Sequence, residues 1–311
     1  MIVSVFTTYL NNRLFYLLII IPCLVLPSFL HAQEFVPLYP ADTDRNEFDG
    51  MATESMRLED PPPSSMERQY RIYSQVSKPT YTYIAAKKSV NTGIGIIIFP
   101  GGGLKEIWYD KEGTDIANWL AEKGISSMII KYSTSTDAQQ NTVVPWNLYI
   151  KALKKDSDTA FNIFQEKSSQ WNVDPEKIGM LGFSAGAWIA YWHTIHPTAE
   201  DYCCVVTEKN RPRFVGLIYG TGRGYKIDYL ENSKELPPFY LVVARDDPYF
   251  DDSNRQSFYT ILKHAPKSEL HVYGQGGHGF GRGKNRSSSS LWLQNFLLWL
   301  RDLELIETLN R

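Results

Sequence analysis

Three residue types that together can activate a nucleophile lie in the second half of the chain. In chain order they are Ser184, the adjacent pair Asp246 and Asp247, and His278. A serine hydroxyl is a weak nucleophile at neutral pH, so it needs a histidine base whose tautomer is held by an acidic residue. This set therefore predicts nucleophilic catalysis, and either aspartate of the pair could supply the acid.

Ser184 stands in the pentapeptide GFSAG, residues 182–186, and the residues around it predict a strand, a tight turn and a helix. Four mostly apolar residues precede Gly182, and a run of helix formers follows Gly186. A G-x-S-x-G sequence between a strand and a helix is a nucleophile elbow, whose turn is too tight for side chains beside the strained serine. We therefore expect the Ser184 hydroxyl to be exposed at a helix amino terminus.

The rest of the chain must bring these residues together, and it alternates between strand-like and helix-like segments. Short apolar runs predict strands at 93–99, 125–132, 178–181, 214–219, 239–244 and 269–273, with a weaker edge strand at 81–86. Apolar residues at helical spacing predict helices at 115–123, 146–169, 252–265 and 287–309. The alternation predicts an α/β fold with a mostly parallel central sheet covered by helices on both faces. Serine, aspartate and histidine would each follow a strand, in the order of the α/β-hydrolase fold.

A run of glycines after the first central strand supplies another part of the predicted site. Attack on a carbonyl needs backbone N–H donors for the oxyanion. Ala185, directly after the nucleophile, is one candidate, and Gly102 and Gly103 of the sequence PGGG are two more. The run lacks the G-K-[ST] ending of a phosphate loop and the G-x-G-x-x-G spacing of a dinucleotide site. It therefore predicts an oxyanion hole.

Composition argues against several other classes of function. The net charge of the 311 residues is −2, the pI is about 6.3, and lysine and arginine are scattered, so we expect no nucleic-acid partner. Cys203 and Cys204 are adjacent and too close for a normal disulfide. His193 and His196 have no further ligand in their pattern and are interpreted as structural. We expect no metal site and no organic cofactor.

The amino-terminal segment predicts export. Residues 1–32 contain a weakly positive start at Arg13 and an apolar run from Leu14 to Leu30, which is typical of a secretory signal peptide. We expect cleavage before Gln33, a secreted or periplasmic protein, and no stable membrane association after removal of the signal. An uncleaved membrane anchor is the alternative, because the run is near the lower limit for a membrane span. Residues 33–80 predict an extended lead-in, and 81–311 a single catalytic domain.

These motifs together resemble the acetylxylan-esterase-like carboxylesterases of the α/β-hydrolase superfamily, relatives of the hormone-sensitive-lipase-like esterases. The likeness runs from about Val36 to Leu300. It is carried by PLYP at 37–40, PGGG at 100–103, Glu112 with Gly113, Trp119 with Leu120, Asp156 before Ala160, GFSAG at 182–186, DDP at 246–248 and GGHGFG at 276–281. The resemblance implies a secreted or periplasmic esterase that removes acetyl or other small acyl groups from plant polysaccharides or oligosaccharides.

The resemblance also bears on the choice of acid. Residues 247–251, DPYFD, resemble the D-P-L-x-D stretch of the hormone-sensitive-lipase-like esterases. This likeness favours Asp247, with Asp246 as the alternative acid.

Some positions differ from the residues that are usual in these acetylxylan-esterase-like carboxylesterases. Leu104 stands where an aromatic residue is usual after PGGG, Ala187 and Trp188 replace a usual Gly-His, and Ser133 stands where arginine is usual. These departures concern the acyl pocket and the substrate contacts. Leu104, Trp108 and Trp188 are the candidate wall residues.

The sequence thus predicts a serine esterase acting on a small ester or an acylated carbohydrate. A lipase or a serine peptidase with the same three residues is an alternative within the enzymes. A catalytically inactive carbohydrate-binding homologue is an alternative from another class. The sequence leaves open the acyl group, the alcohol and the oligomeric state.

Overall fold

The computed structural model describes residues 5–10, 13–18, 35–49, 51, 53–60, 69–135, 144–195, 211–220, 236–283 and 287–306. It divides into a unit of residues 1–34 and a unit of residues 35–311. The first unit contains an antiparallel hairpin of β1 (Val5–Leu10) and β2 (Arg13–Leu18). The predicted signal segment falls in this unit, and its cleavage site lies outside the described residues. In the described ranges, no helix is long and apolar enough to cross a membrane.

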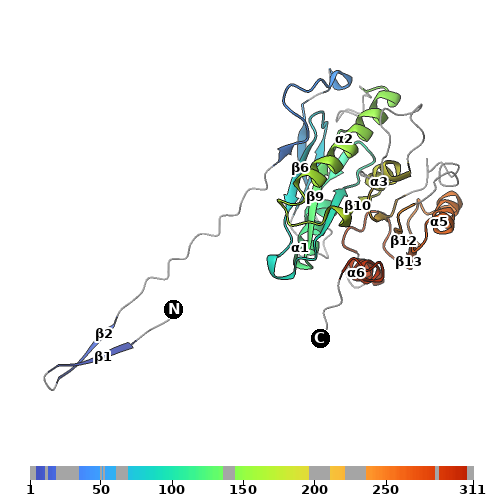
Figure 1. Ribbon diagram of the computed structural model, residues 1–311. Helices are drawn as coiled ribbons and strands as arrows, with labels where there is room; N and C mark the ends of the chain where they lie inside the picture. The colour runs from blue at the N-terminus through green and yellow to red at the C-terminus, as the bar shows by residue number, and fades with distance from the viewer. Residues whose placement is uncertain are drawn as a thin grey trace. The chain divides into compact units, whose positions relative to one another are not determined.

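The second unit contains an eight-stranded sheet with the order β13-β12-β11-β10-β7-β9-β6-β3 (Figure 1). Six neighbouring strands are parallel: β7 (Ile94–Phe99), β9 (Ile125–Lys131), β10 (Ile178–Phe183), β11 (Val215–Ile218), β12 (Phe239–Ala244) and β13 (Glu269–Tyr273). At one edge β6 (Thr80–Ile84) and the two-residue β3 (Val36–Pro37) continue the sheet with antiparallel pairing. The predicted mostly parallel sheet is confirmed.

Helices cover both faces of this sheet. They are α1 (Asp115–Glu122), α2 (Trp146–Lys167), α3 (Ala185–Ile195), α5 (Asp252–His264) and α6 (Trp292–Asp302). Gly182 of β10 faces α3, where an added Cβ would lie 2.5 Å from the Cα of Ala187. Its neighbour Leu181 points to the opposite face and contacts Gly216, which faces Phe296 of α6. Hence α3 and α6 lie on opposite faces, as the α/β-hydrolase prediction requires.

The lead-in has more regular structure than its sequence predicted. Strand β5 (Tyr70–Ser74) pairs with β4 (Ser55–Glu59) on one side and with β8 (Glu106–Trp108) on the other, in a separate antiparallel sheet of order β4-β5-β8. Residues 35–80 fall in the same unit as the large sheet. Both strands are short, and β5 pairs with the distant β8, so neither periodicity nor local turn signals revealed them.

The predicted carboxyl-terminal helix is wrong at both of its ends. The segment begins as a 3₁₀ turn, Ser288–Leu291, and α6 then runs only to Asp302. The Ser287 hydroxyl accepts a hydrogen bond from Ser289 N, and the Ser290 hydroxyl donates to Ser287 O. The Ser287 bond caps the start of the 3₁₀ turn, whereas a hydroxyl bonded to a preceding carbonyl, as in Ser290, competes with a regular helix. His196, Cys203 and Cys204 lie outside the described residues.

Candidate active site

Ser184 occupies a strained turn between β10 and α3, as predicted. Its φ is +48°, a left-handed value that is uncommon for a residue with a side chain. The flanking glycines are required, because a Cβ on Gly182 would lie 2.4 Å from Gly186 O, and one on Gly186 would lie 2.0 Å from Phe99 O. The Ser184 N–H donates to Ile218 O at 2.9 Å, which ties the turn to the neighbouring strand.

A chain of hydrogen bonds leads away from this serine. Ser184 Oγ lies 2.8 Å from His278 Nε2, and His278 Nδ1 lies 2.8 Å from Asp247 Oδ2. The Asp247 side chain is 1% exposed and the His278 side chain 24% exposed. Asp247 Oδ1 accepts a further bond from Tyr249 N at 2.8 Å. Each of the three side chains follows a strand of the sheet. They lie close together because the carboxyl ends of parallel strands lie on the same side of the sheet.

The two adjacent aspartates have different contacts. Asp247 faces the imidazole of His278, whereas Asp246 Oδ1 accepts hydrogen bonds from Gly276 N at 2.9 Å and Gly277 N at 2.7 Å. The loop that carries His278 is therefore bound by Asp246 through its backbone. Successive side chains at a strand end point in different directions. Asp247 can therefore contact the imidazole while Asp246 contacts the loop backbone.

The glycine loop after β7 lies directly against the serine. A Cβ on Gly101 would lie 2.9 Å from Ser184 Cβ. Gly102 and Gly103 both have positive φ, at +138° and +64°, and a Cβ on Gly102 would lie 2.0 Å from Glu106 O. The conformation and the close approach at Gly102 therefore exclude a side chain at that position. The predicted donors Gly102, Gly103 and Ala185 are thus brought to one region.

Leu104 follows these glycines and anchors the loop through its carbonyl. It also has a positive φ, +63°. Its carbonyl oxygen accepts hydrogen bonds from Ser135 N at 2.9 Å, Ser135 Oγ at 3.1 Å and Tyr149 Oη at 3.1 Å. The bonds tie the glycine loop to the segment after β9 and to α2, and they offset the cost of the strained backbone.

The two predicted tryptophan wall residues lie in different surroundings. Trp188 is on α3, one turn after Ser184, where side chains lean toward the helix amino terminus. Its ring is 6.5 Å from that of Trp146, a residue at the start of α2 that is 60% exposed. Trp108 is on β8, with Lys111 Nζ 5.0 Å from its ring centroid. Sequence reasoning missed Trp146, because only the packing of α2 against α3 places it beside Trp188.

Arg45 of the lead-in contacts Ser133, the residue that departs from the usual arginine, and also the buried Asp156. Arg45 Nη1 donates to Asp156 Oδ1 at 2.8 Å, and its Nη2 donates to Ser133 Oγ at 2.7 Å. Tyr39 Oη also donates to Asp156 Oδ1, at 2.7 Å. The buried carboxylate of Asp156 is therefore paired with the guanidinium of Arg45, which comes from the lead-in. Sequence reasoning missed Arg45, since it lies 111 residues from Asp156.

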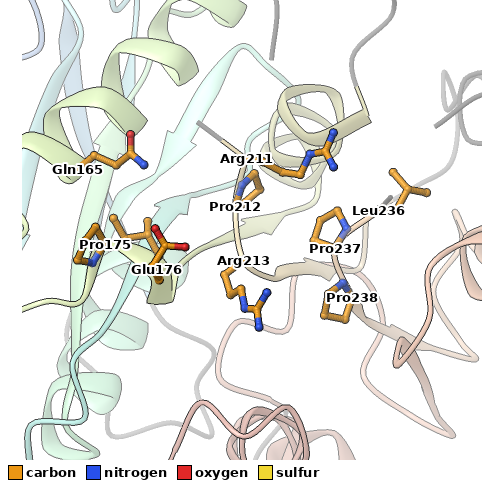
Figure 2. Close-up of a pocket in the computed structure, with 10 residues that line it drawn as sticks. Gln165, Pro175, Glu176, Arg211, Pro212, Arg213, Leu236, Pro237 and Pro238 are labelled. Carbon is orange, nitrogen blue, oxygen red and sulfur yellow. The ribbon is translucent and has the colours of Figure 1, made fainter. Parts of the chain in front are cut away.

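A cavity lies among the segments that lead into β10, β11 and β12 (Figure 2). Its volume is about 390 Å³, and its wall includes Arg211, Arg213, Glu176 and Pro238. These residues precede β10, β11 and β12, so they lie at the amino-terminal ends of the strands, away from Ser184. Among the described residues, no group of three or more His, Cys, Asp or Glu side chains is arranged to hold a metal ion.

Comparison with known proteins gives the chain a family and a fold. Residues 80–303 match the dienelactone hydrolase family. An acetylxylan esterase from Xylanibacter ruminicola is 24% identical over 241 residues, which are 68% of this chain and 46% of that protein. The chain thus spans about half the length of this curated relative. The resemblance to acetylxylan-esterase-like carboxylesterases is confirmed.

Solved structures share the fold at low sequence identity. An acetyl ester-xyloside bifunctional hydrolase from Caldicellulosiruptor lactoaceticus has a TM-score of 0.59 at 20% identity, covering 88% of this chain and 98% of its own. A butyrate-bound esterase from Thermogutta terrifontis has a TM-score of 0.55 at 16% identity, covering 74% and 91%. These likenesses confirm the α/β-hydrolase fold. Because the matching residues make up well over half of the chain, the protein belongs to the dienelactone hydrolase family.

Proposed function

We propose that the protein is a carboxylic ester hydrolase with Ser184 as its nucleophile. The observation that carries the proposal is the unbroken hydrogen-bond chain from a strained serine through His278 to the buried Asp247. The buried carboxylate holds the proton on Nδ1, which leaves Nε2 free to accept the serine proton. Neither the bare motif nor the fold alone would support this chemistry, because both occur in many unrelated enzymes.

The reaction proceeds through an acyl-enzyme. Ser184 Oγ attacks the ester carbonyl carbon while His278 Nε2 takes the hydroxyl proton. The N–H groups of Gly102, Gly103 and Ala185 stabilise the oxyanion of the tetrahedral intermediate. His278 then donates its proton to the departing alcohol. A water molecule, deprotonated by His278, attacks the acyl carbon; the bond from that carbon to Ser184 Oγ breaks, the carboxylic acid leaves, and His278 returns the proton to Ser184 Oγ.

Asp247 is the proposed acid, and Asp246 a residue that positions the histidine loop. The contact between Asp247 Oδ2 and His278 Nδ1 supports the first role. The two bonds from Gly276 N and Gly277 N to Asp246 support the second. Asp246 as the acid would require the loop to give up both of these backbone bonds.

The substrate class we propose is an acetyl or other small acyl ester of a plant carbohydrate. The acetylxylan esterase among its relatives supports this choice. A sugar ring stacks well on an amphipathic aromatic surface. Trp188 of α3, the helix that starts at the nucleophile, and Trp146 at the start of α2 together offer such a surface. The apolar amino-terminal segment supports export of the protein, and plant carbohydrates are encountered outside the cell.

A fluorophosphonate probe and a substrate panel test this proposal. We expect the wild type to be labelled at Ser184 and to hydrolyse p-nitrophenyl acetate and acetylated xylan faster than feruloylated arabinoxylan or a tributyrin emulsion. An unlabelled wild type would favour a carbohydrate-binding protein without catalysis. Preference for tributyrin would favour a lipase.

A further inference from the structure

Glu112 is a buried acidic residue beside the site that takes no part in the mechanism above. It is 4% exposed and belongs to a π-helical turn, Asp110–Thr114, that leads directly into α1. Such turns are rare and are frequently found at functional sites. A buried carboxyl group is costly unless it is hydrogen-bonded, so its partners indicate what it does.

The first partner is the glycine loop. Gly101 N donates to Glu112 Oε2 at 2.6 Å. A Cβ on Gly101 would lie 2.7 Å from this oxygen and 2.9 Å from Ser184 Cβ. The Gly101 peptide is therefore held between the carboxylate and the nucleophile. Since the proposed oxyanion donors Gly102 and Gly103 follow directly, their direction depends on this hydrogen bond.

The second partner leads to the histidine loop. Tyr219 Oη donates to Glu112 Oε1 at 2.6 Å and accepts a bond from Gly281 N at 3.1 Å. Gly281 lies three residues after His278, and the Tyr219 ring lies edge-on to the imidazole at 5.2 Å. Tyr219 has a φ of +38°, and strained backbone of this kind is concentrated at active sites. One carboxylate thus joins both loops that face Ser184.

Charge adds to this geometry. Burial raises the pKa of Glu112, and the hydrogen bonds from Tyr219 and Gly101 oppose that rise. Because both carboxylate oxygens accept hydrogen bonds, the contacts suit the ionised form. An anion here favours the protonated imidazole that forms when Ser184 attacks. Among the described residues, Ser184, Asp247, Tyr219 and Tyr249 contact the imidazole, and the ammonium of Lys111 lies near Gly279 of the same loop.

We propose that Glu112 is a positioning residue which, through Gly101 and Tyr219, holds the oxyanion loop and the histidine loop in register about Ser184. This inference rests on the proposed function, since it assumes that Ser184 and His278 carry out the chemistry. The bridge acts on the orientation of groups that touch the substrate and does not touch the substrate itself.

The test compares E112Q, Y219F and the double variant with the wild type. Glutamine can accept only one of the two bonds and presents an NH₂ group to the other donor. We expect E112Q to lower kcat for p-nitrophenyl acetate by about 10- to 100-fold, with KM changed by less than about threefold. The double variant should resemble the poorer single variant, since both changes break one bridge.

E122Q is the matched control. Glu122 lies on α1, exposed, in a surface pair with Lys87, and such pairs contribute little, so its kcat should equal that of the wild type. Active-site titration with the fluorophosphonate probe corrects every rate for the folded fraction. A rate per titrated site within about twofold of the wild type for E112Q, or multiplicative losses in the double variant, would overturn the bridge. A wild type without esterase activity would instead overturn the proposed function.

Discussion

Two clusters of serine, histidine and aspartate lie at opposite ends of α3. The first consists of Ser184, His278 and Asp247, and the second of Ser157, His193 and Asp158. In the first, the histidine contacts serine through Nε2 and aspartate through Nδ1. In the second, both partners lie on Nδ1, with the serine oxygen at 3.3 Å and the aspartate oxygen at 3.1 Å.

The difference shows that residue types alone do not make a catalytic relay. A relay needs the acid on one ring nitrogen and the nucleophile on the other, because the acid must hold one proton while the base accepts a second. His193 is also buried between α2 and α3, and its ring stacks on Phe161 at 5.4 Å. Ser157 lies within the regular α2 helix. Ser184, in contrast, has a strained backbone and lies at the carboxyl end of the central strand β10. The second cluster therefore supports helix packing.

Removing each serine gives the largest contrast. We expect Ser184→Ala to lower kcat for p-nitrophenyl acetate by at least about 10⁴-fold, because the nucleophile is lost while the fold remains. Ser157→Ala should leave kcat within about twofold of the wild type. Initial rates normalised to folded protein check both variants. Equal losses would mean that the two clusters are not functionally distinct.

Within the first cluster, the two aspartates should differ in the size of their effect. Asp247→Asn should cost about 10³- to 10⁴-fold in kcat, because asparagine favours the wrong histidine tautomer. Asp246→Asn should cost about tenfold, since it weakens only the backbone bonds that position the loop. The ratio of the two kcat values is the measurement. A larger loss for Asp246→Asn would transfer the role of acid to that residue.

The second cluster, Ser157, Asp158 and His193, should contribute to the free energy of unfolding. Burial alone would raise the pKa of Asp158, but the hydrogen bond and charge of His193, and then Lys154, lower it to about 2. This lowered pKa corresponds to about 2 kcal/mol of stability. The contribution is fully present above about pH 4, the pKa of an unfolded aspartate, and is lost as the pH falls toward 2.

Asp158→Asn should therefore lower the melting temperature by about 5 °C at pH 7, and by less below pH 3. Thermal unfolding followed by circular dichroism across this range checks the prediction, with kcat per folded molecule unchanged. A difference in melting temperature that did not vary with pH would refute the ionic role of Asp158.

The smallest effect concerns the tryptophans beside the first cluster. Trp146→Ala should lower kcat/KM for acetylated xylo-oligosaccharides by about five- to tenfold through the loss of a stacking surface. Hydrolysis of p-nitrophenyl acetate should stay within about twofold of the wild type. Leu148→Ala, a change at a 41% exposed site on the same helix, is the control. Equal losses on both esters would exclude a specific contact with the sugar.

Much of the central fold could be predicted from the sequence. The apolar runs at 94–99, 178–183 and 239–244 are strands at nearly the predicted residues, because a parallel strand covered on both faces must be apolar along its whole length. The lead-in strands β4 and β5 could not be predicted in this way. They are partly exposed, and a partner that lies far along the chain stabilises β5.

The sequence by itself determined the elbow around Ser184, because its glycines and the flanking strand and helix patterns are local. It also determined that acid and histidine follow later strands. Only the tertiary structure decided which aspartate bonds the histidine, that Arg45 reaches Asp156, and that Glu112 joins two loops. The Ser184–His278 and Glu112–Tyr219 contacts span 94 and 107 residues. Contacts of this range depend on how strands are ordered and how side chains point at their ends, and no local pattern contains that information.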